Sequence, residues 1–83
     1  MNRFNGSSPV IPHIEFSDTE LHTWFERDRQ HVELRSKLNE ETICEWWDDD
    51  VSQALEDGFL NPRDLHGSAY QYAQDMGLLR SVA

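Results

Sequence analysis

Polar and apolar residues alternate over residues 31–35 (His-Val-Glu-Leu-Arg), which is the pattern of a half-buried β-strand. Residues 22–25 (His-Thr-Trp-Phe) are rich in strand-forming side chains. A tight turn at Arg27 and Asp28 would join these segments into a hairpin with complementary side chains facing each other. The predicted pairs are Glu26 with Arg29, Phe25 with Gln30, Trp24 with His31, Thr23 with Val32, His22 with Glu33 and Leu21 with Leu34.

A helix is the alternative for residues 18–28. Ser17 and Glu20 have the spacing of a capping box, and Phe16 and Leu21 stand where a hydrophobic staple would form. An Arg-Asp pair without glycine is also unfavourable for a two-residue hairpin loop. The complementary pairs across the hairpin favour the strand, so we expect a strand here and keep the helix as the alternative.

A third strand is expected at residues 42–47 (Thr-Ile-Cys-Glu-Trp-Trp), where strand-forming residues recur. It can pair with residues 32–36 across a loop at residues 37–41. The pairing would place Val32 beside Trp46 and Leu34 beside Cys44, and would turn Ile43 and Trp47 to the opposite face, near Trp24.

Two helices are expected after the strands. The first starts at Asp48, Asp49 and Asp50, since carboxylates favour the positive end of a helix dipole. The second is expected to have Asn61 as its N-cap and Pro62 at its first position. Gly58 and Gly77 each precede two large apolar residues, which is typical of a left-handed C-terminal cap with an apolar contact. The expected apolar stripes are Val51, Ala54 and Leu55 in the first helix and Leu65, Ala69, Tyr72, Ala73 and Met76 in the second.

These elements predict an α+β domain over residues 13–83, with a small antiparallel meander of about three strands and two C-terminal helices packed on one face. Residues 1–12 contain several Gly, Ser and Pro residues and are expected to form an N-terminal arm, flexible or docked on the domain. The 83 residues include nine aromatic side chains, which is enough apolar material for one core. With Cys44 alone, the core must hold without an internal disulfide.

The charge balance selects the kind of partner. Sixteen acidic and seven basic residues give a net charge of −9, which repels nucleic acids and anionic membranes and attracts basic surfaces. The sequence shows no secretory signal and no apolar run of the roughly 20 residues that a membrane helix needs. We therefore expect a soluble cytoplasmic protein that binds neither nucleic acid nor membrane directly.

The negative charge is concentrated between Leu38 and Pro62, a stretch without any Lys or Arg. A helix start accounts for three of its carboxylates, but surfaces usually intersperse both signs of charge. A surface that only keeps the protein soluble is one interpretation; a continuous negative surface that binds the Lys and Arg residues of a basic protein is the other. The carboxylates are Glu40, Glu41, Glu45, Asp48, Asp49, Asp50, Glu56 and Asp57.

A second candidate surface is apolar. Trp24, Ile43 and Trp47 are expected on the outer sheet face, and Trp residues often anchor protein interfaces. If this face is exposed, it would form the interface of a homodimer or of an adaptor protein. The alternative is that the N-terminal arm covers it through Val10, Ile11 and Ile14.

Catalytic and metal chemistry find little support in the sequence. The acidic run lacks the spacing and the central glycine of a calcium loop, and the four His residues and Cys44 show no zinc-site spacing. An apolar, acid-flanked position should raise the pKa of Cys44, which is the reverse of activation. We expect no catalytic residue, metal or cofactor; the third class considered, a metal-dependent hydrolase, would require stabilisation by a divalent ion.

In size, acidity and lack of a catalytic motif, the chain resembles small phage-encoded inhibitors of host defence, among them anti-CRISPR proteins and DNA mimics. The resemblance is one of general character over the whole chain, and no residue is carried over. It implies a target in the host cytoplasm, namely a nucleic-acid-binding complex blocked where it would receive DNA or RNA. The function expected from the sequence is therefore an inhibitor that uses its carboxylates, anchored by Trp24 or Trp47. The alternative is an intracellular adaptor or homodimer that uses the aromatic face.

Overall fold

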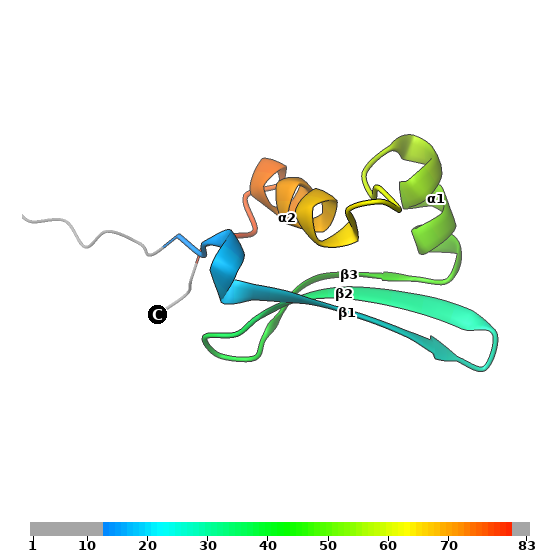
Figure 1. The fold of residues 1–83 in the computed structure, drawn as a ribbon, viewed down its shortest axis with the longest axis horizontal. Coiled ribbons are helices and arrows are strands. Elements are labelled where there is room, and N and C mark those ends of the chain that lie inside the picture. Colours follow the sequence, from blue (N-terminus) through cyan, green and yellow to red (C-terminus); the bar gives the residue numbers. More distant parts are fainter. Residues whose placement is uncertain (1–12, 81–83) are drawn as a thin grey trace, which may run out of the picture.

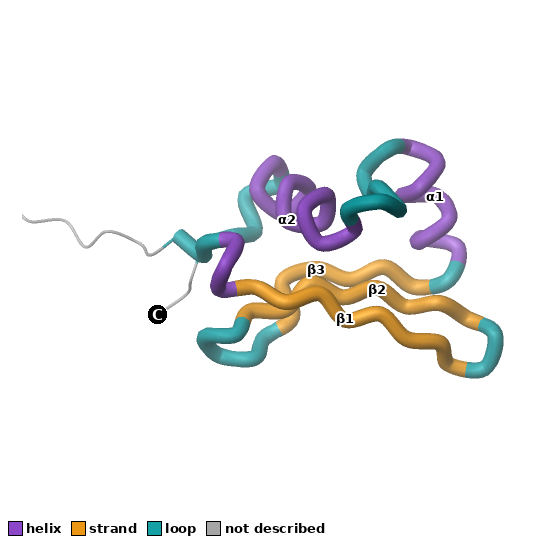
Figure 2. Tube along the Cα trace, in the orientation of Figure 1, coloured by secondary structure: helices purple, strands orange, loops and turns teal. Residues whose placement is uncertain are grey.

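The computed structural model describes residues 13–80, which form a three-stranded antiparallel sheet with two helices on one face (Figure 1). The strands stand in the order β1-β2-β3, and both helices follow them in the chain (Figure 2). The predicted α+β meander with two C-terminal helices is thus confirmed. The elements are a short 3-10 helix at Phe16–Asp18, β1 (Thr19–Glu26), β2 (Arg29–Ser36), β3 (Thr42–Trp47), α1 (Asp49–Asp57) and α2 (Leu65–Asp75).

The hairpin of β1 and β2 has the register that the sequence predicts, pair by pair from Leu21–Leu34 to Glu26–Arg29. The helical alternative for residues 18–28 is wrong, because the 3-10 helix stops at Asp18 and β1 begins directly after it. The glycine-free turn is possible because Arg27 itself adopts a positive φ of 57°, which a two-residue loop between twisted strands requires.

The core lies between the helices and the inner face of the sheet. Val32 and Leu34 of β2 are fully buried there, beneath small side chains that let the helices approach closely. Two residues of the predicted stripes, Leu55 and Met76, are instead 37% and 59% exposed. The core comprises Ile14, Val32, Leu34, Trp46, Val51, Ala54, Leu60, Ala69, Ala73 and Leu79.

Both helices end as predicted, in a left-handed glycine. The φ angles of Gly58 and Gly77 are 84° and 72°. The backbone N–H of Phe59 donates to the carbonyl of Ala54 at 2.9 Å, and the N–H of Leu78 donates to the carbonyl of Ala73 at 2.8 Å. These are the hydrogen bonds of a Schellman motif. In each case the next residue, Leu60 or Leu79, turns back into the core.

The predicted N-cap of the second helix is wrong. Asn61 caps a turn instead, since its side chain accepts a hydrogen bond from the backbone N–H of Arg63 at 2.9 Å. Asp64 caps α2 by accepting from the N–H of Gly67 at 3.1 Å, because the chain must first reverse direction after α1. At the first helix, Asp48 holds the N-cap position without a side-chain capping bond.

The beginning and end of the described chain meet on the helix side of the sheet. The backbone N–H of Ile14 donates to the carbonyl of Leu79 at 2.8 Å, and the Tyr70 hydroxyl donates to the carbonyl of Ile14 at 2.9 Å. Ile14 therefore belongs to the core and does not cover the outer sheet face. Val10, Ile11 and the rest of the predicted arm lie outside the described residues.

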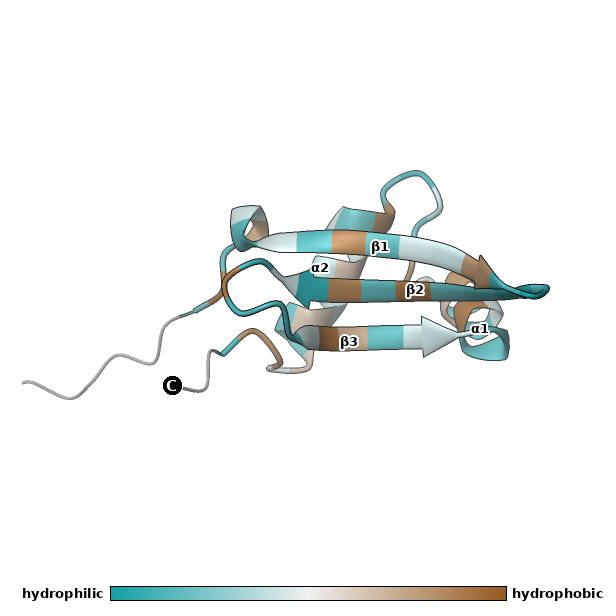
Figure 3. Cartoon of the chain, turned by 90° about the horizontal axis from the view of Figure 1, so that it is seen from below, coloured by the Kyte–Doolittle hydropathy of each residue, from teal (hydrophilic) through white to brown (hydrophobic). Residues whose placement is uncertain are grey.

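The outer face of the sheet buries a carboxylate, although both helices of the described chain lie on the other face (Figure 3). Arg35 Nη2 donates to Glu33 Oε1 at 2.9 Å, and the Thr42 hydroxyl donates to the other carboxylate oxygen. Burial opposes the ionised form, but the bonds from Thr42 and Arg35 and the charges of Arg35 and His22 outweigh it. The pKa of Glu33 is therefore below its ordinary value of 4.5.

This lowered pKa makes the folded state sensitive to acid. An unfolded chain protonates Glu33 near its ordinary pKa, whereas the folded chain keeps it ionised to lower pH. The stabilisation is therefore complete above the ordinary value and is lost as the pH falls through the lowered one. We expect E33Q to cost about 1–3 kcal/mol of unfolding free energy at neutral pH. As the pH falls below the ordinary value of 4.5, E33Q should then lose less stability than the wild type in urea titrations.

The exposed neighbour across the strands, Glu45, provides the control, since E45Q leaves the bonds of Glu33 intact. Its unfolding free energy should fall with acid as steeply as that of the wild type. Equal acid sensitivity of E33Q and the wild type would show that Glu33 contributes nothing.

The two glycine caps allow a second test. A Cβ built on Gly58 or Gly77 meets no atom within 4 Å, so an alanine there carries only the cost of the left-handed backbone. G58A and G77A should each lose about 1 kcal/mol, which lowers Tm by about 4–8 °C in a domain of this size. Asparagine tolerates this conformation better, so G58N should lose less than G58A in the same thermal scan. Alanine variants as stable as the wild type would contradict this account of the caps.

Candidate partner-binding site

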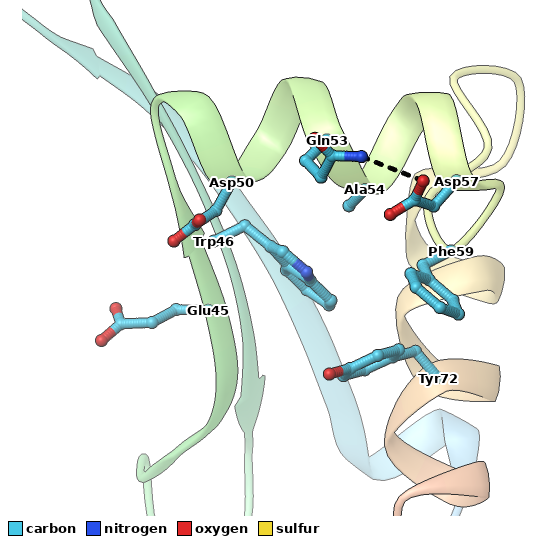
Figure 4. Close-up of a pocket in the computed structure, with 8 residues that line it drawn as sticks. All are labelled: Glu45, Trp46, Asp50, Gln53, Ala54, Asp57, Phe59 and Tyr72. Atoms are coloured by element: carbon cyan, nitrogen blue, oxygen red, sulfur yellow. Dashed lines mark hydrogen bonds between the residues drawn. The ribbon is translucent and has the colours of Figure 1, made fainter.

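Residues from three different parts of the acidic stretch line one groove. Glu45 comes from β3, Asp50 from the first turn of α1 and Asp57 from its last turn. The groove lies between the β3 edge and the two helices, as Figure 4 shows. None of its lining residues carries a positive charge; they are Glu45, Trp46, Asp50, Gln53, Ala54, Asp57, Phe59 and Tyr72.

Aromatic rings form the apolar part of the groove. Tyr72 lies at their centre, with its ring centroid 5.2 Å from that of Trp46 and 5.4 Å from that of Phe59, both in edge-to-face contact. In Figure 4 the three rings converge, with Glu45 and Asp50 to one side of them and Asp57 beside Phe59. The volume is about 320 Å³, so the groove can take a side chain but not a large cofactor.

Each ring is positioned by a different local rule. Trp46 lies opposite Val32 on the inner face of the sheet, but β3 is an edge strand, so its indole reaches the rim of the core. Phe59 follows the left-handed Gly58, whose cap geometry turns the chain sharply at the end of α1. Tyr72 lies on α2 one turn before Met76 and is partly buried against the core.

The other five carboxylates of the predicted site do not line this groove. Glu40 and Glu41 lie in the loop before β3, at the opposite end of that strand from α1 (Figure 1). Glu41 lines a separate hollow together with Arg80. The carboxylates are thus divided along β3 and do not form one cluster. Asp48, Asp49 and Glu56 complete the set, at the start and on the outer side of α1.

Strand pairing brings in a cation that the acidic stretch itself lacks. Arg29 at the start of β2 places its Nε 4.0 Å from the Asp48 carboxylate. The Arg29 side chain is 74% exposed, so this ion pair is weak and screened by salt. It leaves the charge of Glu45, Asp50 and Asp57 uncompensated within the groove.

The two tryptophans of the predicted apolar site do come together, on the outer face of the sheet. Trp24 and Trp47 flank His31 of β2, with ring centroids 5.1 Å and 3.6 Å from the imidazole. They bury His31, yet remain 37% and 45% exposed themselves. The row Trp24–His31–Trp47 crosses all three strands on the outer face, near the end of β3 from which the chain enters α1.

Ile43 does not belong to this row, which corrects the sequence-based expectation. The pairing of β2 with β3 shifts its register between Leu34 and Arg35. The bulge turns Ile43 toward the core, where it lines a hollow with Ile14 and Leu78. Periodicity alone could not locate this extra residue.

Cys44 occupies a site that suppresses thiol chemistry. Burial, reinforced by the neighbouring Glu45 carboxylate, raises its pKa to about 12, as the sequence predicts in direction. Within residues 13–80, no three His, Cys, Asp or Glu side chains gather closely enough to hold a metal ion. The carboxylates that line the groove can attract a positively charged partner.

Sequence reasoning missed the aromatic half of the groove. The sequence predicts Tyr72 in the apolar stripe of a helix and Phe59 beside a helix cap, and both predictions describe local roles only. A hint lay in the residue after Gly58, which is a large aromatic side chain at a position that a helix cap leaves half exposed. The meeting of Phe59 and Tyr72 with Trp46 depends on how α1 packs across the sheet.

Comparison of the chain with protein-family models, with curated proteins and with solved structures finds no match. None of the helices among residues 13–80 combines the length and the apolar character needed to cross a membrane.

Proposed function

We propose that the protein is a binding protein for a basic protein surface and acts as an inhibitor by occupying it. The observation that carries the proposal is the groove lined by Glu45, Asp50 and Asp57, to which residues 13–80 contribute no Lys or Arg. Carboxylates used only for solubility would be expected to alternate with Lys and Arg over the surface. Here three negative charges instead follow one another along the edge of β3 and along α1.

The partner that fits this charge is a nucleic-acid-binding complex, in the manner of anti-CRISPR proteins and DNA mimics. A groove that binds DNA or RNA is lined with Lys and Arg to neutralise phosphates, so an acidic protein can occupy it. The net charge of −9 and the carboxylates spread along β3 and α1 support this choice. On this proposal the protein contributes no catalysis and binds no nucleic acid itself.

The proposal predicts binding that depends steeply on salt. The tagged full chain is used to capture its partner from host cytoplasm, and the purified pair is then titrated by calorimetry. Raising the salt from about 0.05 M to 0.5 M shortens the Debye length and should weaken binding by about tenfold or more. DNA or RNA added in excess should compete with the protein for the captured partner. An affinity independent of salt would rule out charge-led binding, and absence of competition would rule out the nucleic-acid site.

A second candidate function is supported by the exposed row of Trp24, His31 and Trp47. Two large aromatic side chains on a sheet face that no element of residues 13–80 covers are typical anchors of a homodimer or adaptor interface. This function would use the opposite side of the sheet from the helices.

Sedimentation tests this second candidate. If the row forms a homodimer, replacement of Trp24 and Trp47 by glutamine should convert the dimer to a monomer. Phe25 provides the control, because it is 71% exposed but belongs to the helix-facing side of β1. F25Q should therefore keep the mass of the wild type. A wild-type protein that sediments as a monomer at all concentrations would exclude the homodimer.

A further inference from the structure

We propose that the open edge of β1 is the interface of a homodimer, in which the β1 strands of two copies pair antiparallel and join two sheets into one. The inference goes beyond the proposed function, because it concerns contact between copies of this chain and not the binding of a basic protein. It rests on residues 23–26, the second half of β1, which are exposed to solvent.

The outward backbone groups of β1 have no partner within the described chain. Directly before β1, the carbonyl of Asp18 accepts from the N–H of Lys37 across the strand pair at 2.8 Å. Even-numbered residues of β1 therefore direct their backbone groups toward β2, and odd-numbered residues direct theirs outward. Among residues 13–80, no hydrogen bond from outside the sheet reaches the backbone of Leu21, Thr23 or Phe25. An edge of this kind is a template for another strand, and β1 contains neither the Lys nor the Pro that commonly protects one.

Two aromatic side chains are exposed on opposite faces of this edge. Trp24 on the outer face is 37% exposed, and Phe25 on the helix-facing side is 71% exposed. A partner stacked on one face of the sheet would cover one of these rings and leave the other in water. A strand beside β1 borders both faces at once, so edge pairing is the arrangement that covers both rings.

A second copy of β1 is complementary to the first. With the two-fold axis at Trp24, the two Trp24 side chains lie opposite each other, and each His22 lies opposite Glu26 of the other copy. Thr23 of each copy exchanges both of its outward backbone hydrogen bonds with Phe25 of the other copy. The two Phe25 side chains then become diagonal neighbours on the helix-facing side, where each loses part of its exposure.

The other symmetric registers are less favourable. An axis at Thr23 would place Glu20 opposite Glu26 of the other copy, and like charges facing each other destabilise a strand pair. An axis at His22 would pair the first half of β1, where Thr19 is buried and its backbone N–H is already used within its own chain. The axis at Trp24 is therefore the one that uses the exposed half of the strand and opposes unlike groups.

The chosen register joins the aromatic rows of the two copies. Each copy contributes Trp24, His31 and Trp47 across its three strands, so the two rows run end to end on the outer face of the combined sheet. The two-fold axis stands perpendicular to that sheet, so the helices of both copies lie on its other side. Dimerisation would thus double the aromatic surface that an adaptor partner could contact.

Sedimentation of the full chain is the first test. Pairing through half a strand belongs to the small interfaces of roughly 1,200 Å² or less, so the mean mass should rise toward that of a dimer between about 10 μM and about 1 mM. F25Q should raise the dissociation constant by about tenfold, because a large ring no longer loses its exposure. W47Q should keep the mass of the wild type, since Trp47 does not border β1. A wild type that is monomeric throughout would overturn the proposal, and so would a dimer that survives in F25Q and dissociates in W47Q.

A proline variant tests the backbone pairing itself. T23P removes one outward N–H and leaves the hydrogen bonds between β1 and β2 intact, and edge strands tolerate proline at such positions. T23V keeps the N–H and is the matched control. T23P should dimerise about tenfold or more weakly than T23V, with both variants folded by circular dichroism. Equal dimerisation of the two variants would refute edge pairing.

Hydrogen exchange followed by NMR locates the interface in the unaltered protein. The amides of Thr23 and Phe25 should exchange several times more slowly at about 1 mM than at about 0.05 mM protein. The amide of Glu45 points outward from the other edge strand, β3, and should exchange at the same rate at both concentrations. Protection that is independent of concentration would show that another part of the same chain occupies the edge. Protection that appears only with a captured partner would show a foreign strand, and either result would overturn the homodimer.

Salt separates this inference from the proposed function. Two copies that each carry a net charge of −9 repel each other, so raising the salt should not weaken the dimer, although it weakens the binding of a basic partner. Dimerisation by β1 together with salt-independent partner binding would leave the dimer standing and remove the proposed function. Salt-dependent partner binding by a chain that stays monomeric would do the reverse.

Discussion

The central strand β2 must be buried on both faces, although the helices cover only one of them. On the inner face this is achieved by core packing over Val32 and Leu34. On the outer face the neighbouring strands cover it, with tryptophans flanking His31 and hydrogen bonds satisfying Glu33. The tryptophans of the outer face therefore bury His31 and at the same time expose aromatic surface. Substitutions there should affect the stability of the domain as well as any binding to this face.

The inner side explains why a groove exists at all. Two short helices cannot cover the whole of a three-stranded sheet, and a groove remains where β3 meets both helices. Trp46 bridges this gap, as its indole packs on the core from one side and meets Tyr72 on the other. The groove is lined by side chains of β3 and of both helices. Asp50 at the start of α1 and Asp57 at its end make its border negative.

Features that depend on residues close together in the chain can be predicted from the sequence. Alternation and cross-strand complementarity gave the hairpin register, and the glycines gave both helix ends. The N-cap was misplaced because Asn61 and Asp64 can both cap, and only the path between the helices decides between them. The bulge at Ile43 and the groove depend on packing between distant segments, so periodicity carries no information on them. The acidic stretch was visible in the sequence, but not which of its carboxylates converge.

The pairing of His13 with Arg80, beside that of Ile14 with Leu79, has a further consequence. The polypeptide enters and leaves this domain at adjacent points, at the end of the sheet opposite α1 (Figure 1). Such a geometry suits insertion into a surface loop of a carrier protein, because neither junction has to be stretched. A carrier joined there would hold the acidic rim outward, and it would turn the domain into a portable module for presenting negative charge.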